Sequence, residues 1–190
     1  MASNVGRPIF AANSYIRVGR HLSDLRDIAD RKINAERAKI VEALPHAFST
    51  VKASQNRVGM LQSSNTARDL RDKCAEAMSQ LGDHIIREYR WAASTAIFLT
   101  QRFARSLTEA APGQMAPLHQ FCVDQLAHDL GVLGMPEALR GILPALDARR
   151  DAILIDVGIE LDRTFAERRR SAIRNIFMGL TNLISKAIGK

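Results

Sequence analysis

The middle of the chain carries a nearly heptad pattern of apolar residues that is sustained for about 40 positions. Spacings of three and four residues place apolar side chains on one face of a helix. Aromatic residues make up only 5% of the chain, and β-branched residues do not alternate, so strands are not indicated. The pattern therefore predicts a long helix that packs against other helices, through Ala67, Leu70, Cys74, Ala77, Leu81, Ile85, Ala92, Ala96, Leu99, Phe103 and Leu107.

Two further long helices are predicted on either side of this one. The first begins near Ser23 or Asp24 and runs to about Leu61, with Pro45 expected to kink or split it. The polar stretch 62–66 (QSSNT) separates it from the second and offers several N-caps. The last helix is expected to begin at Pro144 and to continue to the end of the chain.

A short-helix insert is expected between the second and last long helices. Ala111, Pro112 and Gly113 are expected to end the second helix. Pro117 can then open a short helix that runs to Leu130, and another short helix is expected over 137–143.

These elements predict an all-α protein, an elongated antiparallel bundle of three long helices plus a short helical insert. Helices of roughly 35–45 residues reach roughly 50–65 Å, and such bundles are often completed by dimerisation or higher assembly, so a homo-oligomer is expected. The predicted organisation is a basic N-terminal arm (1–21) and a helical bundle domain (22–190). That domain contains the insert (112–144) and a basic amphipathic C-terminal helix (168–190).

The C-terminal segment has no acidic residue after Glu167. At helical spacing, its apolar residues fall in one arc roughly 140° wide. Such a stripe must be buried against a membrane, a partner or the bundle itself, and continuity with Leu154, Val157, Leu161 and Phe165 favours the bundle. The residues predicted to dock on a membrane or partner are Arg168, Arg169, Arg170, Ile173, Arg174, Ile176, Phe177, Leu180, Leu183, Ile184 and Lys186.

The chain carries 27 Lys and Arg against 20 Asp and Glu, so anionic partners are favoured. Acidic lipid and nucleic acid both fit this charge. Candidates for phosphate contacts are Arg7, Arg17, Arg20, Arg31, Lys32, Arg37 and Lys39. No helix-turn-helix, RRM or zinc-finger motif is recognisable.

Two clusters could carry chemistry. His119, Cys122, Asp124, His128 and Asp129 resemble a metal-ligand set in composition, but their spacing does not suit zinc. His84 and Glu88 stand four residues apart, and a surface ion pair is the favoured interpretation. No nucleotide-binding, metalloprotease or nucleophile-elbow motif is present, so we expect a non-enzyme with no cofactor, no metal and no identifiable small-molecule substrate.

Only Cys74 and Cys122 are present, and both are predicted to be buried free thiols of a reducing compartment. No apolar run suggests a signal peptide or a spanning helix, so a cytoplasmic location is expected. The leading hypothesis is a structural protein that associates peripherally with an anionic membrane through its C-terminal helix. A nucleic-acid-binding or packaging protein and a secreted helical effector or toxin remain the alternatives.

Overall fold

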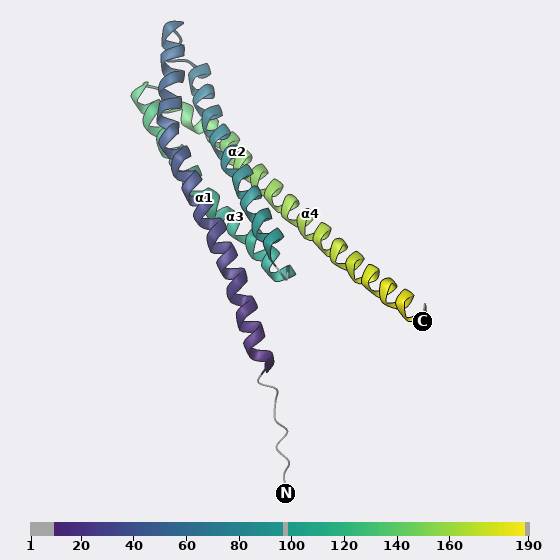
Figure 1. Cartoon of the computed structure of the whole chain (residues 1–190). Coiled ribbons are helices and arrows are strands. Elements are labelled where there is room, and N and C mark those ends of the chain that lie inside the picture. Colours follow the sequence, from purple (N-terminus) through teal and green to yellow (C-terminus); the bar gives the residue numbers. More distant parts are fainter. Residues whose placement is uncertain (1–9, 97–98, 189–190) are drawn as a thin grey trace.

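The computed structural model shows four long helices that run alternately up and down (Figure 1). Its backbone is described for residues 10–96 and 99–188, and its side chains for residues 21–96, 99–171 and 174. The helices are α1 (Phe10–Arg57), α2 (Ser64–Thr95), α3 (Gln101–Val132) and α4 (Ala138–Ile188). The prediction of an all-α antiparallel bundle is confirmed. The predicted count of three long helices plus a short insert is wrong.

The insert is absent because the prolines expected to end helices lie inside them. Pro112 and Pro117 both belong to α3, and Pro144 belongs to α4. All three are exposed, while the core face of α3 stays unbroken along Leu107, Ala111, Met115, Leu118 and Cys122. Burial of such a face stabilises a helix more than local propensity does. Proline has no backbone N–H to donate, and a helix tolerates this loss best on its solvent side.

The same holds for α1. Pro45 is exposed and does not split the helix, because Leu44 and Phe48 beside it are buried in the core. The helix also begins earlier than predicted, at Phe10, so residues 10–21 of the predicted arm are helical in their backbone.

A break that the sequence pattern hides separates α2 from α3. The apolar spacing passes through residues 96–100, yet α2 ends at Thr95. The side chain of Thr100 accepts a hydrogen bond from the Phe103 N–H at 3.1 Å and so caps the start of α3. The chain reverses there, and the predicted second helix becomes two antiparallel ones.

The other two connections are also tight. Gly59 and Gly134 have φ of +70° and +72°, a left-handed conformation that ends a helix and favours glycine. Met135 N–H donates to the Leu130 carbonyl at 2.8 Å, which closes the end of α3. Ser63, one of the predicted caps, accepts a hydrogen bond from the Thr66 N–H and starts α2.

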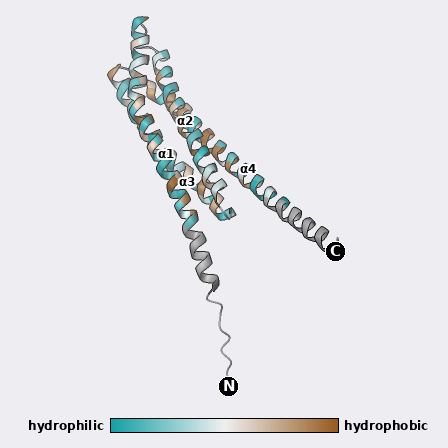
Figure 2. Cartoon of the chain, viewed as in Figure 1, coloured by the Kyte–Doolittle hydropathy of each residue, from teal (hydrophilic) through white to brown (hydrophobic). Residues whose placement is uncertain are grey.

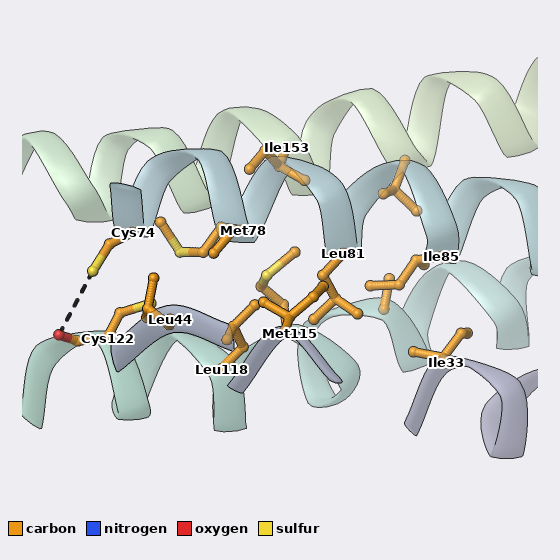
Figure 3. Packing of buried hydrophobic residues seen from close by; sticks show 14 of the residues in the cluster. Ile33, Leu44, Cys74, Met78, Leu81, Ile85, Met115, Leu118, Cys122 and Ile153 are labelled. Carbon is orange, nitrogen blue, oxygen red and sulfur yellow. Dashed lines mark hydrogen bonds between the residues drawn. The ribbon is translucent and has the colours of Figure 1, made fainter. Parts of the chain in front are cut away.

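The core lies along α2, which packs against each of the other three helices. Over the described part of the chain, α1 and α4 do not contact one another. Figure 3 shows side chains from all four helices meeting in this core: Ile33, Leu44, Met78, Leu81, Ile85, Met115, Leu118 and Ile153. A Cβ at Gly82 would run into the Ile153 side chain, so α2 and α4 approach closely at that point.

Hydrophobic and hydrophilic residues are interspersed along every helix, as expected for amphipathic helices (Figure 2). Within the described residues, no helix has a stretch that is both long and apolar enough to span a bilayer.

Candidate functional site

Arg168 marks the place where α4 passes the end of α2. Its guanidinium Nη2 donates to the carbonyl oxygens of Ser94 at 2.6 Å and Ala96 at 2.8 Å, and lies 3.4 Å from that of Ala93. These carbonyls belong to the end of α2, where intrahelical partners run out. A positive charge there also complements the helix dipole. Arg168, predicted as a docking residue, is therefore held at the surface of the bundle by the end of α2.

Beyond Arg168, α4 continues as helix to Ile188. Those twenty residues correspond to about 30 Å of helix. The last buried side chains are those of Leu161 and Thr164, and every described side chain after Phe165 is exposed, including the predicted Arg169, Arg170 and Arg174. Figure 1 shows this part of α4 diverging from the other helices. We call residues 169–188 the tail.

The remaining predicted docking residues lie outside the described side chains: Ile173, Ile176, Phe177, Leu180, Leu183, Ile184 and Lys186. Their helical positions can still be compared with those of the buried residues of α4. At 3.6 residues per turn, the apolar arc of the tail is centred roughly 150° around the helix from Leu146, Ile153, Val157 and Leu161. The expectation that the tail stripe continues the line of Leu154, Val157, Leu161 and Phe165 concerns tail side chains outside the described ones and stays a prediction.

The N-terminal segment emerges at the same end of the bundle as the tail. With four alternating helices, the start of α1 and the end of α4 point the same way (Figure 1). Leu22 and Phe103 line one surface hollow, so α1 reaches the end of the bundle near Leu22. Residues 10–21 extend about 18 Å further. The predicted phosphate contacts Arg7, Arg17 and Arg20 lie outside the described side chains.

The basic surplus of the protein resides in these two ends. Residues 1–23 and 168–190 contain nine of the 27 Lys and Arg and none of the 20 Asp and Glu. Residues 24–167 therefore hold 18 basic and 20 acidic side chains and are close to neutral. Folding brings the described parts of the two acid-free segments, 10–23 and 168–188, to one end of the molecule.

The other predicted phosphate contacts take part in contacts along α1. Lys32 pairs with Glu88 at 3.0 Å and lies over the Trp91 ring at 4.1 Å. Arg37 donates to the Gln114 carbonyl at 3.0 Å. Arg31 donates to the carbonyl of Asp27, and Lys39 pairs with Glu36, each within α1. These four residues do not form one cluster of free cations within the described chain.

His84 and Glu88 do lie side by side as predicted, with His84 Nε2 3.9 Å from Glu88 Oε1, but the pair is largely buried and not at the surface. Glu88 is buried, and its carboxylate is held by Lys32 from α1 and by Arg87 at 3.6 Å. Burial, together with Arg87, holds the pKa of His84 below its ordinary value, although Glu88 and Glu36 oppose the shift. The cluster ties α1 to α2, and no hydroxyl or thiol nucleophile is hydrogen-bonded to the histidine among the described side chains.

The histidine-rich stretch of α3 is dispersed among separate contacts. His119 pairs with Asp147 at 2.9 Å, Asp124 accepts from Gln120 at 2.8 Å, and Asp129 pairs with Lys52. Over the residues that the structure describes, no group of three or more His, Cys, Asp and Glu side chains is arranged to hold a metal ion.

Cys74 and Cys122 are buried free thiols, as predicted. The Cys74 thiol points at the Cys122 carbonyl, 3.9 Å away (Figure 3). The neighbouring Cys122 side chain and burial raise the pKa of Cys74 far above its ordinary value, so it is an unreactive core residue.

Comparison of the chain with models of known protein families, with curated proteins and with solved structures found no match. What the protein does must therefore be inferred from its own residues and their arrangement.

Proposed function

We propose that the protein is a non-enzymatic helical bundle that binds an anionic membrane surface with the end where α1 begins and α4 ends. One observation carries this proposal: the two acid-free basic segments meet the bundle at the same end, where α1 begins and α4 ends. A near-neutral body with a strongly positive end is drawn to an anionic surface in one orientation.

Electrostatics supplies the first part of the attraction. Arg169, Arg170 and Arg174 are exposed and form no ion pair with any residue of the described chain. A Lys or Arg held close to an anionic membrane contributes about 1 kcal/mol. Basic segments of this size support reversible binding that weakens as salt increases.

The tail supplies the second part. Its sequence combines a wide apolar arc with a polar face of Asn, Ser, Thr and Gly, bounded by Arg174 and Lys186. Helices of this type lie in the membrane interface with the apolar face among the acyl chains. Because α4 continues about 30 Å beyond Arg168, the tail is long enough to act apart from the bundle.

A nucleic-acid binder has less support. Lys32 and Arg37, which could have continued a basic stripe along α1, are engaged with Glu88 and Gln114. Phosphate binding also gives no role to the apolar arc of the tail, because counterion release depends on charge alone.

The test is co-sedimentation with vesicles of phosphatidylcholine alone and vesicles that also contain phosphatidylserine. Full-length protein should bind only the anionic vesicles, and a chain ending at Ser171 should lose this binding. The truncation leaves Arg168 in place, so the contact with the end of α2 is kept. Equal binding by both chains, or no binding by either, contradicts the proposal. Retention on DNA or RNA without vesicle binding would support the nucleic-acid alternative.

A single substitution separates insertion from attraction by charge. Phe177→Asp should lower binding to anionic vesicles several-fold, because a charge must then enter the interface. Val58→Asp is the matched control, since Val58 is 65% exposed at the opposite end of the bundle. It should leave vesicle binding unchanged. Equal effects of the two variants would show that the tail does not insert.

A further inference from the structure

The outer face of α4 carries apolar residues that the bundle does not cover. Ile155 is 62% exposed and Ile159 is 58% exposed. Ala148, Ala152 and Ala166 are exposed at the same alternating spacing of four and three residues. The buried residues Val157 and Thr164 stand on the opposite side of the helix. Large aliphatic side chains left in water next to a complete core indicate a surface with another partner.

This outer face follows a heptad repeat that extends into the tail. Continuing the spacing by sequence adds Asp162 and Arg169 and then only apolar positions: Ile173, Ile176, Leu180, Leu183 and Ala187. A repeat of seven kept over this length is typical of a helix that pairs with another helix in a coiled coil. We call the line from Ala148 to Ala187 the outer seam.

The charges within and beside the outer seam indicate which helix pairs with it. Asp156 and Asp162 precede Arg169 and Arg170 along α4, and all four are exposed. None of them forms an ion pair in the described part of the protein. These four charges run from acidic to basic along the helix, and this order is complementary to itself when two copies run antiparallel. In a parallel pair, aspartate would meet aspartate and arginine would meet arginine, at a cost in affinity.

We infer that a second copy of this chain docks antiparallel on the outer seam of α4, with the two-fold axis near residue 164. Asp156 and Asp162 of one copy then lie beside Arg169 and Arg170 of the other. This interface is isologous, because both copies use the same surface. The small residues Ala148 and Ala152 come opposite positions 180 and 176 of the second copy, where the larger Leu180 and Ile176 stand.

This interface leaves one flank of the tail free to contact a membrane. Because the copies run antiparallel, their basic ends lie at opposite ends of the dimer, and each copy attaches through its own end along this shared face. The apolar arc of the tail is wider than the outer seam, because Phe177, Ile184 and Ile188 stand beside it on one flank. Arg170 and Arg174 stand on the same flank of the helix, and the antiparallel pair exposes this flank along both copies.

The first test is sedimentation equilibrium of the full-length protein with no vesicles present, so its outcome is independent of membrane binding. The wild type should be a dimer. Ile155→Asp combined with Ile159→Asp should raise the dimer dissociation constant roughly 100-fold or more, because charged groups would enter the seam. The melting temperature of the monomeric fold should be kept, since both side chains are exposed within one copy.

The matched control is Val58→Asp combined with Val132→Asp, which changes two exposed apolar residues far from the outer seam. It should remain dimeric. A monomeric wild type, or a dimer that survives the Ile155 and Ile159 substitutions, overturns the inference.

A charge exchange tests the antiparallel arrangement separately. Asp156→Arg with Asp162→Arg should weaken the dimer, and so should Arg169→Asp with Arg170→Asp. The chain carrying all four substitutions should dimerise as the wild type does, because complementarity is restored. If the variant with all four substitutions dimerises no more tightly than either double variant, the antiparallel assignment is overturned.

Discussion

The guanidinium of Arg168 on α4 lies 2.6 Å from the carbonyl oxygen of Ser94, within the last turn of α2. The contact joins residues that are 74 positions apart and fixes where α4 leaves the bundle. Before it, α4 contributes buried residues to the core. After it, the sequence contains no acidic side chain.

Replacing Arg168 with alanine should lower the free energy of unfolding by about 1 kcal/mol, because carbonyls at the end of α2 lose a charged donor. The value is modest because the arginine is largely exposed and water can replace it. Urea denaturation measures the effect. Arg169→Ala is the control and should change stability by less than about 0.5 kcal/mol, as for other surface substitutions. Equal losses would contradict the assigned role of Arg168.

Gly82→Ala should destabilise the bundle by about 1–3 kcal/mol, because the new methyl group meets Ile153 where α2 and α4 approach closely. Gly141→Ala is the control, since a Cβ there has no neighbour within 4 Å. That substitution should stabilise the protein by roughly 0.5–1 kcal/mol through helix propensity. Thermal denaturation measures both variants. A loss of stability at Gly82 alone supports the close approach of α2 and α4, and equal effects at both positions would contradict it.

Lys52→Met should cost about 2–3 kcal/mol, because it removes a cation from the buried Asp129 carboxylate. Gln125 still donates to Asp129 at 2.7 Å, so the carboxylate keeps one partner. Lys73→Met is the matched control at an exposed pair with Glu76, and should change stability by less than about 0.5 kcal/mol. Comparable losses from both substitutions would contradict a buried role for the Lys52–Asp129 pair.

Stability should fall as the pH drops below about 6.5, the ordinary pKa of histidine. Burial beside Arg87 holds the pKa of His84 below this value in the folded state, so the unfolded chain binds a proton more readily. The contribution of His84 to stability is fully present above the pKa of this histidine in the unfolded chain. It is lost as the pH falls towards the lower pKa of His84 in the folded protein. His84→Gln should flatten this part of the profile of unfolding free energy against pH. The same change at the exposed His128 is the control and should leave the His84 contribution in place. A profile unchanged by His84→Gln contradicts the assignment.

The helical class and most core residues follow from spacing alone. Leu70, Cys74, Leu81 and Ile85 were placed on one face of a helix by sequence and are all buried in the structure. Such predictions succeed because burial of one face is what makes a long amphipathic helix stable. The free, buried state of both cysteines was predictable for the same reason.

The helix ends were harder to predict because they depend on tertiary contacts. Pro112 looks like a terminator in sequence, yet it lies on the solvent side of a helix whose other side is fully packed. Thr100 looks like a member of an apolar run, yet its hydroxyl caps a new helix. Neither outcome is visible until the neighbouring helices are in place.

The candidate site was predictable in composition and not in arrangement. The acid-free tail and the basic arm were recognised from sequence, but only the fold puts them at one end. The outer seam was missed because Ile155 and Ile159 stand within a helix that has a second, buried apolar face. From sequence alone, residues of both faces merge into one broad pattern.

The most direct measurement for the proposed membrane binding is vesicle co-sedimentation of two charge-reversal variants. One carries Arg17→Glu, Arg174→Glu and Lys186→Glu, which lie in the basic segments and outside the charges assigned to the interface between copies. The other carries Arg57→Glu, Arg68→Glu and Arg140→Glu, which are exposed near the opposite end and make the same change in net charge. Binding to phosphatidylserine vesicles should be lost in the first and kept in the second. Equal binding by the two variants would contradict attachment through the end where α1 begins and α4 ends.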